Sequence, residues 1–269
     1  MTLEQMKNII AEDHETKHLK LSDVDVLTVY QYIVARDTNK DDRYTPVLVT
    51  EPYIEIIYKP SEKLAKEIKE RDIRRHLLSF DSDIYIQNAK LSDFETYNDE
   101  RLNAFNHAED FINGFSKSTY KKGLYIYGAY GTGKTYLLSA IAHALAEKEI
   151  NVLFVSMPDA SRSIREGFND RSLEERINEL KQADVLMLDD LGGESSSAWF
   201  RDEVLLPVLQ YRLSASLPVF ISSNLSMKDL TNFYAHTKNE TDMVKSVRII
   251  QRIKDLTTYV ALTESKFED

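Results

Sequence analysis

Residues 128–135 have the types and the spacing that phosphate binding requires. They read Gly-Ala-Tyr-Gly-Thr-Gly-Lys-Thr, which fits the P-loop pattern G-x-x-x-x-G-K-[ST]. Glycines let backbone N–H groups turn towards phosphate oxygens, and a following helix directs its positive end at the same anion. We expect Lys134 to contact the β- and γ-phosphates and the Thr135 hydroxyl to bind Mg²⁺. The alternative, a chance glycine turn, does not explain a complete motif between an apolar strand and a helix.

The ATP site is therefore predicted to lie in one continuous segment, formed by Gly128, Ala129, Tyr130, Gly131, Thr132, Gly133, Lys134, Thr135 and Tyr136.

Two adjacent carboxylates follow an apolar run farther along the chain. Residues 185–188 read Val-Leu-Met-Leu, and Asp189 and Asp190 come directly after them. This is the Walker B pattern, in which Asp189 would hold Mg²⁺ through water and Asp190 would orient or deprotonate the attacking water. An acidic turn at the end of a strand is the simpler alternative. The position of Asp189 and Asp190 after a complete P-loop favours the catalytic interpretation.

Asn224 ends the next predicted strand, after Ser222 and Ser223. The carboxyl ends of parallel strands face the ligand crevice, so Asn224 can meet the γ-phosphate or the water. It can also cap the following helix. The order of the motifs favours the first role.

Arg248 and Arg252 lie four residues apart on one predicted helix. Such a pair is typical of a solvated basic face. It can also supply an arginine finger to the γ-phosphate of a neighbouring subunit. The pattern alone is equally compatible with both interpretations.

The elements that must position these residues alternate between strands and helices. We predict strands over residues 151–156, 183–190, 218–224 and 257–262, in addition to the strand before the P-loop. Helices are expected over residues 99–115, 157–167, 173–180, 198–213, 227–234 and 241–256, and after Lys134. Alternation with short loops predicts a parallel sheet covered by helices on both faces.

The first 78 residues contain none of these motifs and form a separate small α+β region. Apolar spacing predicts two short helices, one near residues 3–10 and one near residues 24–34 with Ser22 as its cap. A hairpin over residues 46–58 and a charged helix up to residue 76 follow. We therefore predict an N-terminal domain over residues 1–78, a linker over 79–98 and an ATPase domain over 99–269.

Composition excludes several classes of protein. The 269 residues include no cysteine, so disulfides and thiolate metal sites are excluded. No apolar run reaches membrane-spanning length and the N-terminus is too polar for a signal peptide, so a cytoplasmic protein is expected. The net charge is −10 and neither half of the chain is basic. Nonspecific binding to duplex DNA should accordingly be weak.

Taken in order and spacing, residues 128–135, 188–192, 199–203, 222–224 and 248–252 resemble DnaI-type replicative helicase loaders, which are AAA+ ATPases related to DnaC. The resemblance covers roughly residues 84–262. It implies ATP hydrolysis with Mg²⁺, with Lys134 in Walker A and Asp189 and Asp190 in Walker B. By the same resemblance, Asn224 is sensor 1 and Arg248 the finger supplied in trans, with Arg252 as the second choice.

The resemblance also implies partners. The N-terminal domain would bind the hexameric replicative DNA helicase, and ATP would promote self-association. A helical insertion over residues 159–181 would contact single-stranded DNA weakly through Arg162, Arg165 and Phe168, although an ordinary amphipathic helix explains it equally well. No membrane contact is implied. The rivals are an IstB-like transposition helper and a non-hydrolysing adaptor switched by ATP.

Two departures from the family pattern stand out. Many members of the family hold zinc with cysteines of the N-terminal domain. This chain has no cysteine, so zinc is not inferred for it. The core also ends soon after Arg252. A C-terminal helical lid and a sensor 2 arginine are therefore not expected.

Overall fold

The computed structural model describes residues 1–39, 42–79, 86–166, 172–195, 197–237 and 240–264. The chain divides into two compact units, Met1–Arg71 and Asp72–Asp269. None of the helices in these described ranges is long and apolar enough to cross a membrane.

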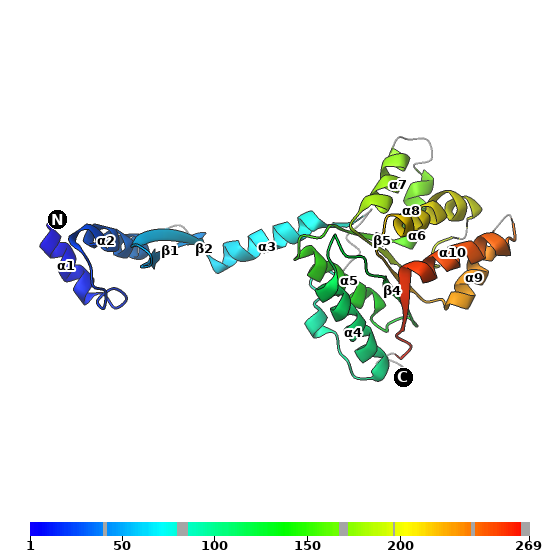
Figure 1. Cartoon of the computed structure of the whole chain (residues 1–269), viewed down its shortest axis with the longest axis horizontal. Coiled ribbons are helices and arrows are strands. Elements are labelled where there is room, and N and C mark those ends of the chain that lie inside the picture. Colours follow the sequence, from blue (N-terminus) through cyan, green and yellow to red (C-terminus); the bar gives the residue numbers. More distant parts are fainter. Residues whose placement is uncertain (40–41, 80–85, 167–171, 196, 238–239, 265–269) are drawn as a thin grey trace. The chain divides into compact units, whose positions relative to one another are not determined.

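The first unit consists of two helices and a hairpin (Figure 1). Its elements are α1 (Leu3–Glu12), α2 (Asp23–Thr38), β1 (Tyr44–Val49) and β2 (Glu55–Pro60), and the two strands pair antiparallel. Ser22, the predicted cap of α2, forms a capping box with Asp25. The next helix, α3 (Glu62–His76), begins in this unit and continues past its end.

A small apolar core and an ionic cluster hold α1 and α2 together. The buried core residues are Ile10, Val26, Val29, Tyr32 and Ile33. Beside this core, Arg36 donates hydrogen bonds to both carboxylate oxygens of Asp13, at 3.2 and 2.6 Å. The loop after α1 is thereby joined to α2.

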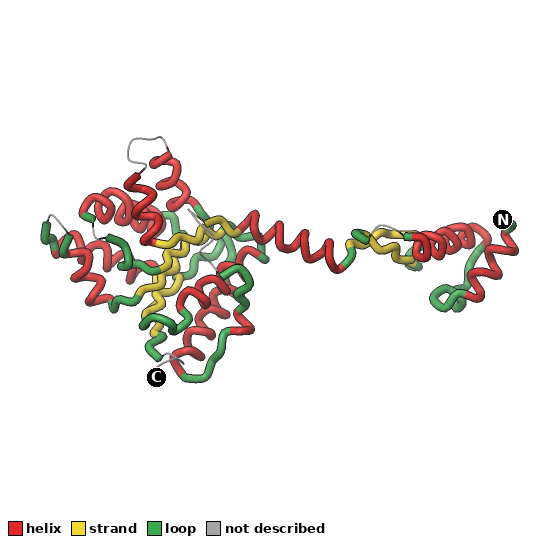
Figure 2. Tube along the Cα trace, turned by 180° about the vertical axis from the view of Figure 1, so that it is seen from behind, coloured by secondary structure: helices red, strands yellow, loops and turns green. Residues whose placement is uncertain are grey.

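The second unit is built on a six-stranded parallel sheet with the order β3-β5-β6-β7-β4-β8. Its strands are drawn in yellow in Figure 2. The strands are β3 (Leu77–Ser79), β4 (Gly123–Tyr127), β5 (Val152–Ser156), β6 (Val185–Asp189), β7 (Val219–Ser223) and β8 (Thr257–Ala261). Strand β7 lies between the strand before the P-loop and the strand that ends in the acidic pair. The carboxyl ends of all three strands therefore meet at one edge.

Helices cover both faces of this sheet (Figure 1). Their bounds are α4 (Asp99–Gly114), α5 (Lys134–Ala146), α6 (Met157–Glu166), α7 (Ser172–Gln182), α8 (Leu206–Ser214), α9 (Met227–Ala235) and α10 (Met243–Leu256). Side chains of β4 alternate between the two layers: Leu124 and Ile126 join the core beside α4 and α5, and Tyr125 joins the core beside α6–α10. The predicted fold, a parallel sheet flanked by helices after a small α+β region, is confirmed.

The structure differs from the sequence prediction around residues 77–98. Residues 77–79 form β3 and pair with β5, so they belong to the second unit. Ala89 and Phe94 are buried, and Phe94 lies in the core beside α4 and α5. The division between units accordingly falls at residues 71–72, ahead of the predicted boundary at residue 78. The segment predicted as a linker contributes to the packed core.

The long helix predicted over residues 198–213 contains a wider turn. Residues Phe200–Leu205 form a π-helix, η2, and α8 follows with Pro207 near its start. The N–H of Leu206 bonds to the carbonyl of Arg201, five residues back. Because proline lacks an N–H and its ring crowds the preceding turn, an α-helical ladder cannot run through this point unchanged.

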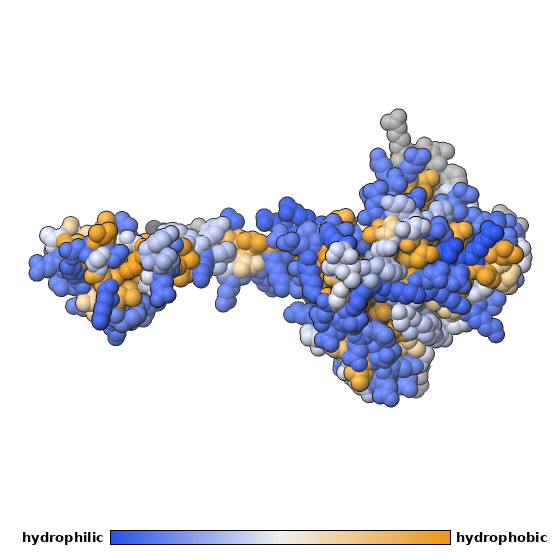
Figure 3. Space-filling view, viewed as in Figure 1, coloured by the Kyte–Doolittle hydropathy of each residue, from blue (hydrophilic) through white to orange (hydrophobic). Residues whose placement is uncertain are grey.

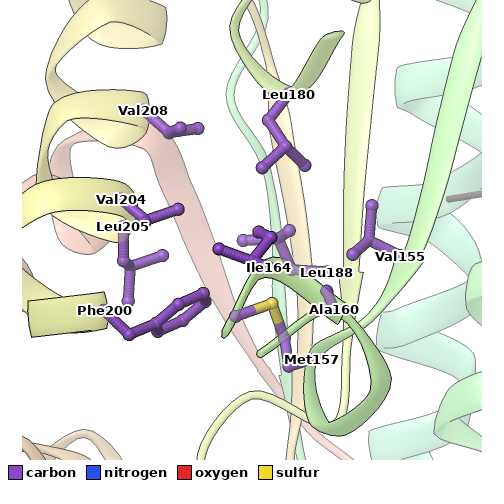
Figure 4. A pocket seen from close by; sticks show the side chains of 10 residues that line it. All are labelled: Val155, Met157, Ala160, Ile164, Leu180, Leu188, Phe200, Val204, Leu205 and Val208. Atoms are coloured by element: carbon purple, nitrogen blue, oxygen red, sulfur yellow. The ribbon is translucent and has the colours of Figure 1, made fainter. Parts of the chain in front are cut away.

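Beneath α6 lies a small apolar pocket between the sheet and η2 (Figure 4). It is lined by Val155, Met157, Ala160, Ile164, Leu180, Leu188, Phe200, Val204, Leu205 and Val208. With no polar group in its lining, it offers nothing to orient a nucleotide.

Candidate nucleotide-binding site

The phosphate-binding loop connects the end of β4 to the start of α5. Gly131 and Gly133 have φ values of 77° and 92°, which side chains with a Cβ rarely adopt. At Gly128 a Cβ would lie 1.8 Å from the carbonyl oxygen of Leu262, so the neighbouring chain leaves no room for a side chain. The helix begins at Lys134, as predicted. The loop therefore has the backbone shape of an anion cradle at a helix N-terminus.

Lys134 is buried within this cradle. Its Nζ donates a hydrogen bond to the carbonyl oxygen of Ala129 at 2.7 Å and lies 5.9 Å from the ring centroid of Tyr130. Burial lowers the pKa of Lys134, and the charges of Asp189 and Asp190 oppose that shift. The lysine thus lies within electrostatic reach of both predicted Walker B carboxylates.

A hydrogen bond joins Thr135, at the start of α5, to Asp189, at the end of β6. The Thr135 hydroxyl lies 3.1 Å from each oxygen of the Asp189 carboxylate. Ser222, on the intervening strand β7, donates to the same carboxylate at 2.5 Å. Burial raises the pKa of Asp189, while the hydrogen bonds from Ser222 and Thr135 counteract the shift. A hydroxyl and a carboxylate at one point are oxygen ligands of the kind that Mg²⁺ prefers.

Asp190 and Asn224 form the second contact of the site. The Asn224 amide donates to Asp190 Oδ1 at 3.0 Å, and the N–H of Asp190 donates to Ser222 Oγ at 2.9 Å. Asp190 has a φ of 57°, a left-handed conformation that directs the chain sharply away from β6. In the part of the chain that the structure describes, the buried Oδ1 of Asn224 has no hydrogen-bond partner. An unpaired buried acceptor beside a carboxylate suits the binding of a donor such as water.

Arg101 is a site residue that the sequence prediction missed. It is buried at the start of α4, and its guanidinium donates to the Thr132 carbonyl in the phosphate-binding loop at 2.6 Å. Its Cζ lies 4.1 Å from the ring centroid of Phe94 and 4.7 Å from that of Tyr97. Arg101 therefore joins the segment before α4 to the loop. The one signal in the sequence that could have found Arg101 is its position. It comes two residues after the start of a predicted helix, and several aromatic residues precede that helix.

The same segment also meets Tyr136, the last residue of the predicted ATP site. The Tyr136 hydroxyl accepts from the N–H of Lys90 at 3.3 Å and donates to its carbonyl at 3.2 Å. Its ring stacks on Phe94. Tyr136 thus fixes this segment beside α5.

The two candidate finger arginines have different surroundings on α10. Arg252 donates to Gln210 at 2.6 Å and pairs with Asp255 at 3.2 Å. The side chain of Arg248 is exposed and makes no hydrogen bond or ion pair with any described residue. The structure brings Lys134, Thr135 and the Walker B pair together but joins neither arginine to them.

Only part of the predicted DNA-contacting insertion can be located. Arg162 lies on α6, with an exposed side chain 3.5 Å from Asp159. Phe168 lies outside the described residues, as does the side chain of Arg165.

The available residues fit ATP with Mg²⁺. The loop has the glycine conformations of a phosphate cradle, Lys134 supplies a cation, and Thr135 with Asp189 supplies oxygen ligands. Together with the parallel sheet, this arrangement defines a P-loop ATPase fold of the AAA+ class.

Comparison with known families agrees with that class. The model of the bacterial DnaA ATPase domain matches residues 89–247, more than half of the sequence. This chain therefore belongs to the bacterial DnaA ATPase domain family.

Individual relatives are helicase loaders by name. The replicative helicase loader DnaI of Bacillus subtilis (strain 168) is 42% identical over 163 residues, which are 60% of this chain and 52% of that protein. The replicative helicase loader DnaC of Escherichia coli (strain K12) is 23% identical over 147 residues, which are 54% of this chain and 59% of that protein. The chain thus spans between half and three-fifths of the length of these relatives.

A crystal structure of DnaI matches with a TM-score of 0.63 at 34% identity and covers 74% of this chain and 100% of that one. The resemblance to DnaI-type proteins predicted from the sequence is confirmed.

Proposed function

We propose that this chain is an ATP-dependent loader that delivers a replicative DNA helicase onto single-stranded DNA during replication initiation. The observation that carries the proposal is the assembled ATPase site, with Asn224 hydrogen-bonded to Asp190, in a chain 42% identical to DnaI over 60% of its length. A site of this kind supports hydrolysis as well as binding, which favours a motor over an adaptor that only binds ATP.

The side chains divide the chemistry of hydrolysis among them. Lys134 places a positive charge where the β- and γ-phosphates would lie. Asp190 orients or deprotonates the attacking water, and Asn224 holds the Asp190 carboxylate through its amide. Mg²⁺, held by Thr135 and Asp189, would neutralise phosphate charge when bound with ATP.

Arg248 supplies the remaining charge to a second copy of the chain. An exposed cation without a partner among the described residues is available to another subunit, whereas Arg252 is engaged by Gln210 and Asp255. An arginine supplied in trans stabilises the charge that develops during phosphoryl transfer. Turnover then depends on ATP-dependent self-association.

The first unit binds the helicase. Several large apolar side chains remain exposed on its helices although its core is small: Leu3, Ile9, Val24, Leu27 and Val34. Figure 3 shows hydrophobic side chains at the surface of this unit. A unit of this size has a marginal core, and exposed apolar surface of this kind favours a protein partner.

Contact with single-stranded DNA is weak and local. The net charge of −10 opposes a broad electrostatic footprint, and Arg162 on α6 is an exposed cation suited to a backbone contact.

Binding of two fragments to a replicative helicase tests the assignment. The pairing of β3 with β5 places residues 77–79 in the second unit, so the fragments are residues 1–71 and 72–269. The first should retain the helicase without ATP, and the second should bind nucleotide without retaining the helicase. Helicase affinity that follows residues 72–269 would contradict the assignment.

A matched pair of substitutions in the full chain sharpens this test. Leu27→Asp changes a leucine on α2 that is 49% exposed, and Leu102→Asp changes one on α4 that is 46% exposed. Only Leu27→Asp should weaken helicase binding. Equal loss in both variants would count against a docking surface on the first unit. Capture of a transposase in place of a helicase would support the transposition helper.

A further inference from the structure

A buried carboxylate, Glu194, lies just beyond the Walker B pair and has no part in the chemistry above. It is 5% exposed, and no ion pair among the described residues reaches it. Burying a carboxylate without a cation is costly, and an apolar side chain would pack more cheaply at such a place. The cost of burying the Glu194 carboxylate indicates that this side chain has a specific role.

The carboxylate of Glu194 closes the turn that carries Asp190. The carbonyl of Asp190 accepts from the N–H of Gly193 at 2.9 Å, and Gly192 has a φ of 92°, so the chain reverses immediately after Asp190. Glu194 Oε2 then accepts from the N–H of Gly192 at 2.8 Å. A Cβ at Gly193 would lie 2.2 Å from Asp190 Oδ2, which shows how closely the turn approaches that carboxylate.

The other oxygen of Glu194 anchors the turn to α9. The hydroxyl of Tyr234, buried in α9, donates to Glu194 Oε1 at 2.6 Å. The carbonyl of Tyr234 is itself held by Arg201 at 2.9 Å. Arg201 is fully buried and pairs with Asp202 and Glu240. Tyr234 is therefore fixed at both its hydroxyl and its carbonyl.

We propose that Glu194 and Tyr234 are positioning residues for ATP hydrolysis: their hydrogen bond ties the Asp190 turn to α9 and holds the Asp190 carboxylate where it acts on water. Asp190 is then constrained from two sides, by Asn224 on β7 and by the Glu194 turn. A small displacement of a reacting group lowers the rate while leaving distant binding contacts intact. The inference rests on the proposed hydrolysis at Asp190.

Substitutions that change one polar group test it in the full chain. Tyr234→Phe deletes only the hydroxyl, and Glu194→Gln keeps one carbonyl oxygen that can accept from Gly192 or from Tyr234. We expect each to lower kcat by about tenfold, with the ATP dissociation constant and KM within about twofold of wild type. Glu194→Ala should lower kcat further, so that glutamine restores part of the rate.

Ser246→Ala is the matched control. Ser246 is fully buried, and its hydroxyl donates to the carbonyl of Thr231, which joins α10 to α9 without touching the turn. This variant should lose thermal stability and keep kcat. Wild-type kcat in Tyr234→Phe and Glu194→Gln, with melting temperatures lowered as in Ser246→Ala, would overturn the inference. So would a parallel loss of ATP affinity.

A readout without turnover separates this inference from the proposed function. Mg²⁺ with ADP and aluminium fluoride mimics the transferring phosphoryl group, and its affinity relative to ADP should fall in the Glu194 and Tyr234 variants only. An unchanged ratio overturns the inference even if the chain loads a helicase. A chain that binds no helicase contradicts the proposed function, while the ratio still decides on Glu194.

Discussion

The guanidinium of Arg101, in the first turn of α4, donates a hydrogen bond to the carbonyl oxygen of Thr132 in the phosphate-binding loop at 2.6 Å. Its Nε donates to the carbonyl of Glu95 at 2.5 Å, and its cation lies against the rings of Phe94 and Tyr97. A charged donor thus connects the loop to a segment that precedes it by more than thirty residues. This long-range contact therefore holds the backbone of the phosphate cradle, in addition to the conformations of its glycines.

Replacing Arg101 should weaken nucleotide binding without touching a phosphate-binding side chain. A hydrogen bond from a charged donor contributes roughly 1.5–3 kcal/mol, so Arg101→Ala should raise the ATP dissociation constant about tenfold or more. Titration with a fluorescent ATP analogue measures this. Lys148→Ala is the control, since Lys148 also donates a hydrogen bond to a backbone carbonyl, that of Ile112 in α4, which is not part of the phosphate-binding loop. Equal effects in both variants would show that Arg101 acts only on stability.

Lys134→Ala and Asp190→Asn should separate binding from hydrolysis. Lys134→Ala removes the cation from the cradle and should abolish measurable ATP binding. Asp190→Asn keeps the shape of the side chain and loses its negative charge, so it should bind ATP normally and fail to turn it over. Equilibrium binding and phosphate release measure the two effects. Equal ATP affinity in Lys134→Ala and wild type would contradict the P-loop assignment.

Arg248→Ala should bind ATP as a monomer and lose stimulated turnover, by several orders of magnitude if it acts as trans fingers do in related enzymes. Mixing Arg248→Ala with Lys134→Ala should restore part of the activity, because one variant supplies an intact pocket and the other an intact finger. Arg252→Ala is the comparison, since Gln210 and Asp255 already occupy that arginine. A mixture that stays inactive while both variants assemble would place the finger elsewhere.

The first unit should lose stability in acid through Asp13. The hydrogen bonds from Arg36 hold the pKa of Asp13 well below its ordinary value of 3.8. Because the folded pKa lies below the unfolded one, the stabilisation is complete above about pH 4 and is lost as the pH falls further. Amide-exchange protection factors in α1 and α2 should fall over this range.

Asp13→Asn should lower the same protection factors at neutral pH and flatten their dependence on acid. Asp37→Asn is the control. Asp37 also forms an ion pair with Arg36, but its side chain is 58% exposed, so that pair should contribute little to stability. A pH profile of Asp13→Asn identical to that of wild type would exclude the Asp13–Arg36 pair as its cause.

The sequence by itself determined the elements whose signals are local. The P-loop could be predicted because its glycines, Lys134 and Thr135 are consecutive, and the Walker B pair because it directly follows a buried strand. The parallel sheet with helices on both faces followed from the alternation of strands and helices. The residue roles within the site remain predictions, although the structure brings Lys134, Thr135, Asp189, Asp190 and Asn224 to one edge of the sheet.

Only the tertiary structure decided the contacts between distant residues. Arg101 reaches Thr132 across 31 positions, Tyr234 reaches Glu194 across 40, and Gln210 engages Arg252 across 42. Strand β3 has three residues, too few for a periodic pattern, and is a strand because β5 pairs with it. The physical reason is common to all of them: a hydrogen bond or a strand pairing is set by the arrangement of the packed elements in space, and local sequence patterns do not encode that arrangement.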